Sequence, residues 1–420
     1  TVIQVTDSSP SPETPSPSVI PGRKKVDSRA SDRASRTWWD ADADEYHRTH
    51  GEFLGVGSTD GEFIWCPEGL HEGDVGLLGD TRHADVLEVG CGSAPPPEEE
   101  EAAAPMPTAD SGAGTILRVD PTFDALVPLD ATIEKLADGF EFTEGPVWVR
   151  QGEPEPHLLF SDIPANAIKK WSTSEGVTDF MNPVYDGDPG ERTQVGSNGL
   201  LIDGEGRLIL CEHGNRRVSR IEADGSITVL ADRYDGKRLN SPNDAVFHSN
   251  GWLYFTDPPY GLAGQDEDPT KELDFNGIFR LSQEGEVQLL VSDQTRPNGI
   301  GLSPDERTLY VANSDGNQKV WFAYDVLEDG TLGPGRVFFD VNAESAPGAA
   351  DGMTIDRNGN LFATGPGGIW VISPDGRHLG SIQPDEVPAN AAWGDDGSTL
   401  YMTARTGLYR IRLTTSGPIP

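Results

Sequence analysis

Six oxygen-bearing side chains recur at one position of a repeated sequence unit. Each unit has a polar residue, a short apolar run, an Asp/Asn/Gly turn and a second apolar run, and the leading residues are Glu144, Asn198, Asn243, Asn298, Asp351 and Asn390. All six carry carboxylate or amide oxygens and none is His or Cys, a set that disfavours soft transition metals and suits Ca²⁺. Two carboxylates would also balance the charge of a divalent ion. The pattern therefore predicts a calcium site, with other divalent cations possible.

A turn-forming role is the alternative interpretation of the same position. Asn and Asp side chains bond to their own backbone and often begin strands after turns. This explains the asparagines well, but it does not explain Glu144, because glutamate is a poor turn residue. The metal interpretation is favoured, since one repeat position would gather all six side chains in one place.

The spacing of the repeats predicts the elements that position these residues. The leading residues are 39 to 55 positions apart, which suits a four-stranded propeller blade, and apolar runs between the units supply third and fourth strands. The sixth unit lacks a fourth strand, and ATIEKLA at 131–137 could complete it and remove an exposed edge. The sequence thus predicts an all-β, six-bladed β-propeller over residues 114–420; an open β array or two sandwiches are the alternatives. The inner strand of each blade lines the channel of a propeller, so the six residues would meet there.

Composition limits the partners. The chain has 69 acidic and 32 basic residues and a net charge of −37, which repels phosphate backbones and anionic lipid surfaces. We therefore expect no nucleic acid and no membrane partner. Three cysteines (Cys66, Cys91 and Cys211) suggest neither a disulfide scaffold nor a thiolate site. Without a membrane-length apolar run or a signal-like opening, we expect a soluble protein, cytoplasmic or exported after signal removal; nothing indicates its oligomeric state.

The first hundred residues differ from the repeats. Residues 1–35 are rich in Ser, Pro and charge and are predicted to be a disordered tail. Residues 36–94 predict a small partial α/β fragment, and residues 95–113, with the run PPPEEEE, an acidic Pro/Glu/Ala linker.

The segment ADVLEVGCGSA at 84–94 resembles the first strand and glycine turn of S-adenosylmethionine-dependent methyltransferases. Such a turn binds its cofactor only when a helix follows, and PPPEEEE stands in that place. We therefore expect a truncated fragment that binds no cofactor.

The repeat region resembles a known family. The segments FTEGPVW, LNSPNDAVF, YFTDPPYGL, RPNGIGLSPDERTLYVANSD and DGMTIDRNGNLFATGPGGIWV are similar to those of the calcium-dependent gluconolactonase, regucalcin and senescence-marker-protein propellers, over about residues 114–420. The resemblance implies that Glu144, Asn298 and Asp351 are metal ligands. It implies a fourth ligand or a substrate contact at Asn243, and a proton-transfer role for Asp351.

The expected function is calcium-dependent opening of a sugar lactone. The cation would polarise the carbonyl, and Asp351 would act as general base, or a metal-bound water would supply the hydrolytic oxygen. Two alternatives stay open: hydrolysis of another ester or a phosphotriester at the same site, and a non-catalytic, calcium-stabilised interaction platform.

Other residues are candidate substrate contacts. Besides Asn198 and Asn243, these are His213 in CEHGNRR and Asp257 and Tyr260 in TDPPYGL, which follow second strands at the same end of their blades. For His213 a structural role competes with acid catalysis, and for Asp257 a turn ahead of two prolines is the alternative. Asn166 is a weaker candidate, and Cys211 is expected in the core.

Overall fold

The structure is a computed structural model that describes residues 64–65, 70–71, 106–110, 112–151 and 155–420. The chain divides into two units, residues 1–104 and 105–420. In the first, the described residues are β1 (Ile64–Trp65) and β2 (Leu70–His71), which pair antiparallel. The tail predicted at 1–35 and the rest of the fragment predicted at 36–94 lie outside the described residues. Within the described part of the chain, no helix is long and apolar enough to cross a membrane.

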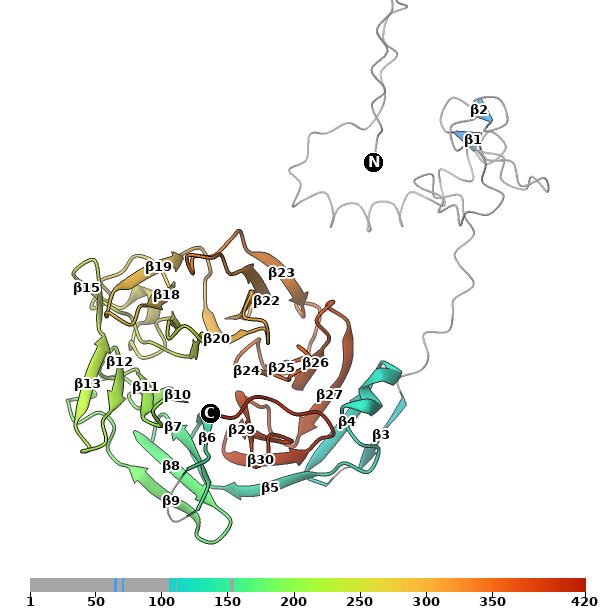
Figure 1. The fold of residues 1–420 in the computed structure, drawn as a ribbon, viewed down its shortest axis with the longest axis horizontal. Helices are drawn as coiled ribbons and strands as arrows, with labels where there is room; N and C mark the ends of the chain where they lie inside the picture. Colours follow the sequence, from blue (N-terminus) through green and yellow to red (C-terminus); the bar gives the residue numbers. More distant parts are fainter. Residues whose placement is uncertain (1–63, 66–69, 72–105, 111, 152–154) are drawn as a thin grey trace, which may run out of the picture. The chain divides into compact units, whose positions relative to one another are not determined.

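Six antiparallel sheets are arranged in a ring about a central axis, so the predicted six-bladed propeller is confirmed (Figure 1). The first two blades are β6 (Thr143–Val149), β7 (His157–Asp162), β8 (Ala167–Ser172) and β9 (Gly176–Met181), then β10 (Ser197–Ile202), β11 (Leu208–Glu212), β12 (Arg217–Ile221) and β13 (Ile227–Ala231). The next two are β16 (Ala245–Phe247), β17 (Leu253–Asp257), β18 (Gly277–Leu281) and β19 (Val287–Val291), then β20 (Pro297–Leu302), β21 (Thr308–Asp315), β22 (Gln318–Asp325) and β23 (Arg336–Asp340). The last two contain β24 (Met353–Ile355), β25 (Leu361–Gly365), β26 (Gly368–Ile372) and β27 (His378–Pro384), then β28 (Asn390–Gly394), β29 (Thr399–Ala404) and β30 (Gly407–Arg412).

The sixth blade takes its outer strand from the beginning of the propeller. β5 (Ile133–Asp138) pairs antiparallel with β30, from Gly407↔Asp138 to Ile411↔Ile133. Without β5, the outer edge of β30 would expose a row of unpaired backbone groups. The ring is therefore closed by strands from its two ends in sequence.

The fifth blade is wider than the repeats predict. β4 (Gly114–Arg118) adds to its outer strand β27, and β3 (Met106–Asp110) adds to β4, giving a six-stranded sheet. β3 lies in the range 95–113, for which the sequence predicts a linker. Strand pairing through backbone groups demands little of side-chain composition, so a five-residue segment can join an available edge without an apolar pattern.

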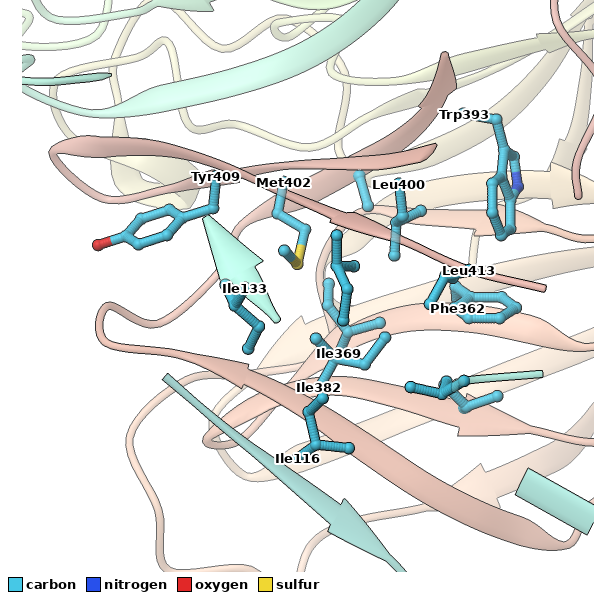
Figure 2. Close-up of a cluster of buried hydrophobic side chains, with 14 of the residues drawn as sticks. Ile116, Ile133, Phe362, Ile369, Ile382, Trp393, Leu400, Met402, Tyr409 and Leu413 are labelled. Carbon is cyan, nitrogen blue, oxygen red and sulfur yellow. The ribbon is translucent and has the colours of Figure 1, made fainter. Parts of the chain in front are cut away.

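Apolar side chains from neighbouring blades form the core. In the cluster between the last two blades, Ile133 of β5 packs with Tyr409 and Met402 of blade six and Ile369 and Ile382 of blade five (Figure 2). Each such side chain contributes about 1.5–3 kcal/mol when fully buried. This packing between blades, together with the backbone pairing of β5, holds the ring closed.

Short elements lie on the loops. These are the 3-10 helices η1 (Pro121–Ala125) and η2 (Gln265–Glu267) and the hairpin of β14 (Arg233–Tyr234) with β15 (Lys237–Arg238). Cys211 is fully buried in β11 and packs in an apolar cluster with residues of blades two and three, as expected for a core residue.

Candidate active site

One cavity of about 320 Å³ brings together five of the six repeat-position side chains. It lies where the inner strands of the blades begin, and the five are Glu144, Asn198, Asn243, Asn298 and Asp351. All but Asp351 are at most 5% exposed. Other segments add polar side chains, such as Gln194 and Tyr260, and apolar residues, such as Val387 and Pro388. The cavity is therefore lined by both oxygen-bearing and apolar side chains.

Irregularities in the inner strands place these side chains at the cavity. The pairing of inner with second strands shifts register between Glu144 and Val147, between Ser197 and Leu200, and between Pro297 and Ile300. A bulge of this kind re-aims the side chains beside it. Three of the five site residues thus lie at or within a bulge.

A glycine follows four of the five site residues, and it permits close packing around the channel. A β-carbon on Gly145 would lie 2.0 Å from the carbonyl oxygen of Asn198, and one on Gly299 would lie 2.3 Å from that of Asp351. No side chain fits at these distances. Neighbouring inner strands therefore approach closely enough for side chains from separate blades to share one cavity.

Hydroxyl groups of second strands fix the backbone of the next blade. Ser161 Oγ donates to the carbonyl oxygen of Asn198 at 2.7 Å, and Thr256 Oγ1 donates to that of Asn298 at 2.8 Å. Both hydroxyls are fully buried. These bonds connect the inner strands of Asn198 and Asn298 to the preceding blades, and they hold the site residues in place.

The carboxyl groups of Glu144 and Asp351, which line this cavity, interact electrostatically with the buried carboxyl group of Asp244, which does not line it. Burial, reinforced by the charge of Asp351, raises the pKa of Glu144 well above its usual range. Burial, with the charge of Asp244 added, raises the pKa of Asp351 to about 7, and burial raises that of Asp244 to about 7. A bound cation would favour the ionised form of all three.

Two buried side-chain oxygens of the residues that line the cavity accept no hydrogen bond from the described part of the chain. Asn198 Oδ1 and Asp351 Oδ1 are buried without a partner among the described residues. Asn298 donates its side-chain amide to Ser314 Oγ at 3.2 Å, and Ser314 also contacts the Tyr260 hydroxyl, which leaves Asn298 Oδ1 as the available oxygen. Unpaired buried oxygens are costly unless a ligand meets them.

The oxygens are of the kind that hard cations prefer. In the described part of the chain, no group of three or more His, Cys, Asp or Glu side chains is arranged to hold a metal. A cation in this cavity would therefore be bound by two carboxylates together with amide oxygens. That donor set fits calcium, which takes six to eight oxygen ligands.

Comparison with known proteins identifies the family. Residues 142–406 match the family model described as the SMP-30/Gluconolactonase/LRE-like region. The chain belongs to this family.

Relatives and solved structures agree with this membership. The gluconolactonase of Zymomonas mobilis is 40% identical over 319 residues, which are 72% of this chain and 87% of that protein. A solved structure of a gluconolactonase from Xanthomonas campestris is 31% identical with a TM-score of 0.62, covering 73% of this chain and 96% of that one. The pentonolactonase of Haloferax volcanii is 27% identical over 63% of this chain and 81% of its own length.

Within this SMP-30/gluconolactonase propeller, Asn390 does not line the cavity that the other five repeat-position residues line, although its side chain hydrogen-bonds the carboxyl group of Glu144. Its Oδ1 accepts from its own neighbour, the amide of Ala391, at 2.8 Å, and it lines a second cavity of about 610 Å³, with Asp244. That cavity is formed by residues further along the inner strands and by Pro418–Pro420, so it lies toward the opposite end of the channel.

Of the three loop candidates for substrate contact, one lines the site. Tyr260 lines the cavity. His213 and Asp257 are fully buried and do not: burial lowers the pKa of His213 to about 4, and its β-carbon lies against Gly261. The two Asp257 carboxylate oxygens accept from the backbone amides of Asn240 and Ser241 at 2.7 and 2.8 Å. Asp257 thus shapes the segment that leads to Asn243.

Asn166 also has a structural role. It adopts a left-handed φ of 58°, and its side chain exchanges two hydrogen bonds with the backbone of Tyr185. These bonds join two loops, and the residue does not line the cavity.

Among the lining residues that were not predicted from sequence, four carry polar or aromatic side chains: Phe142, Gln194, Ser314 and Arg405. None occupies the repeat position that identified the inner strands. Ser314 lies in the segment RPNGIGLSPDERTLYVANSD, near the end of β21 (Thr308–Asp315). Its position near the end of a second strand is the signal that could have indicated it.

Proposed function

We propose that the protein is a calcium-dependent lactonase that opens a sugar lactone to its hydroxy acid, with Asp351 as general base. The observation that carries this proposal is the convergence of two carboxylates and three amide side chains on one monosaccharide-sized cavity. Lactone hydrolysis is supported by the gluconolactonase and pentonolactonase relatives. The acceptor is water and the substrate is a small molecule.

Glu144, Asn298 and Asp351 would hold the cation, with Asn243 as a fourth ligand or a substrate contact. The partnerless Asp351 Oδ1 and the orientation of Asn298 support this assignment. When bound, the cation supplies a positive charge that polarises the lactone carbonyl and stabilises the oxyanion of the transition state.

Asp351 is suited to move the proton. Its backbone amide donates to Thr364 O at 3.1 Å, which fixes its position at the cavity. A water oxygen forms a bond to the carbonyl carbon as its proton passes to the carboxylate. The ring C–O bond then breaks, and the released ring oxygen takes up a proton. Placed carboxylates of this kind contribute about 10²–10⁴-fold in rate.

Uncharged polar groups that line the cavity would bind the sugar. Asn198 Oδ1 accepts no hydrogen bond, and Gln194 and Tyr260 present further polar atoms at the cavity. A polyhydroxylated ring offers donors and acceptors that match these groups.

A substrate panel tests the proposal. Background-corrected rates on aldonolactones, aryl esters and phosphotriesters should show turnover of aldonolactones that EDTA abolishes and Ca²⁺ restores. Asp351→Asn should lower kcat by at least about 100-fold, while Asp325→Asn, at a 69%-exposed surface carboxylate, should not.

Preferred turnover of esters or phosphotriesters would replace the lactone assignment with one of the alternatives. Calcium binding without turnover of any substrate would support the interaction platform. Full activity in Asp351→Asn would show that this carboxylate is not the base.

A further inference from the structure

A single cationic side chain, Arg405, lines the candidate active site. It lies in the turn between β29 and β30. In a chain with 69 acidic and 32 basic residues, an arginine at a substrate cavity is notable because an acidic neighbour would normally pair with it.

We propose that Arg405 forms a subsite for an anionic group, so that the substrates are sugar lactones carrying a phosphate, sulfonate or carboxylate substituent. This inference rests on the proposed lactonase function and specifies its substrate class. The guanidinium would donate paired N–H groups to the oxygens of that substituent.

The backbone of Arg405 is fixed beside the predicted metal ligands. Its carbonyl oxygen accepts from Thr143 N at 2.8 Å and from Thr143 Oγ1 at 3.1 Å, and Thr143 directly precedes Glu144. Arg405 also has a left-handed φ of 51°, which is uncommon outside glycine and is often retained at functional sites. The subsite is thereby held at a set position relative to the carboxylates.

The guanidinium is available for a ligand. It lies over the ring of Phe142, 5.8 Å from the centroid, and Phe142 also lines the cavity. Among the described residues, the Arg405 side chain has no ion-pair or hydrogen-bond partner. The carboxylate of Glu386, on the neighbouring loop, already binds Thr406 and Lys135.

Arg405 shares its cavity with the proposed general base, because Arg405 and Asp351 both line it. A cavity of about 320 Å³ holds one monosaccharide, so a ligand at Asp351 can extend a substituent to Arg405.

The test compares glucono-1,5-lactone with its 6-phosphate in wild type, Arg405→Gln and Arg405→Lys. Wild type should have the higher kcat/KM for the phosphate, and Arg405→Gln should reduce the phosphate-to-neutral ratio by about 10- to 100-fold. Arg405→Lys should retain part of the ratio, because it keeps the charge without the paired geometry. Added salt should lower the wild-type ratio.

Arg412→Gln is the matched control. Arg412 is in the adjoining strand β30, 67% exposed and paired with Asp396, and it does not line the cavity. The control should keep the wild-type ratio. Melting temperatures of all variants should agree, which separates loss of the subsite from loss of the fold.

A binding measurement separates this inference from the lactonase proposal. Calorimetry with gluconate and 6-phosphogluconate should show tighter binding of the phosphate in wild type and a loss of that preference in Arg405→Gln. Absence of lactone turnover would refute the proposed function. The preference for 6-phosphogluconate over gluconate would still show whether Arg405 binds an anionic group. Equal ratios and equal binding preferences in wild type and Arg405→Gln would overturn the inference.

Discussion

The buried carboxyl group of Asp244 gives a quantitative test of the electrostatics in the channel. Asp244 is 9% exposed and lines the cavity at the opposite end from the predicted metal ligands. Its Oδ1 accepts from the amide of Ala245 at 2.9 Å. Asp244→Asn keeps an acceptor oxygen at this position and removes the ionisable group.

The size and sign of the effect follow from the pKa. Burial raises the pKa of Asp244 from 3.8 to about 7, and backbone amides of Ala245 and Ile300 act in the opposite direction. Between about pH 4 and pH 7 the folded protein therefore binds more protons than the unfolded chain, so the free energy of unfolding falls as pH rises. At about 1.4 kcal/mol per pKa unit, the ionised group costs about 4 kcal/mol by pH 8.

Urea unfolding in EDTA measures this cost. At pH 4, wild type and Asp244→Asn should have similar free energies of unfolding, whereas at pH 8 the variant should be more stable by up to about 4 kcal/mol. Calcium should reduce the pH dependence of wild type, because a cation favours the ionised carboxylates. Asp130→Asn, at an exposed position, is the control. Equal stability of wild type and Asp244→Asn at pH 8 in EDTA would refute the reasoning.

Three further changes test the packing and the site. Gly299→Ala should lower both melting temperature and kcat/KM, because the new methyl group would meet the carbonyl of Asp351; normal activity would contradict the close-approach argument. Tyr260→Phe should weaken calcium binding by about 10-fold in calorimetric titration, because the Tyr260 hydroxyl contacts Ser314, which accepts from the proposed ligand Asn298. Unchanged affinity would exclude this role. Ile133→Ala should destabilise the protein by about 2–5 kcal/mol in urea unfolding, whereas Val119→Ala, at a 51%-exposed side chain, should cost little; equal effects would show that β5 packing does not close the ring.

The repeats made the blades predictable, because each contains its own alternation of apolar strands and turns. Strand β4 was not predicted: the repeats already supply four strands for the fifth blade, so no missing strand indicated that GTILR pairs with β27. The same holds for β3, whose composition is that of the predicted linker.

The site was predictable to the extent that it follows the repeat. Glu144 and Asn298 lie at bulges, whereas β28 pairs with β29 in unbroken register from Asn390↔Thr403 to Gly394↔Thr399. Sequence spacing does not reveal a bulge, and a change of register redirects a side chain. Asn390 therefore occupies the repeat position but lines the other cavity. Arg405 lies outside the repeat position, and its place at the cavity depends on the fold.

The closing strand has a consequence for synthesis on the ribosome. β5 is made about 270 residues before its partner β30. At about 5–20 residues per second, roughly 15 to 55 s pass before that partner is made. During this interval the earlier blades can form, but the last blade cannot. Ring closure therefore waits until β30 has been made, and an unpaired β5 is exposed to mispairing with other nascent chains until then.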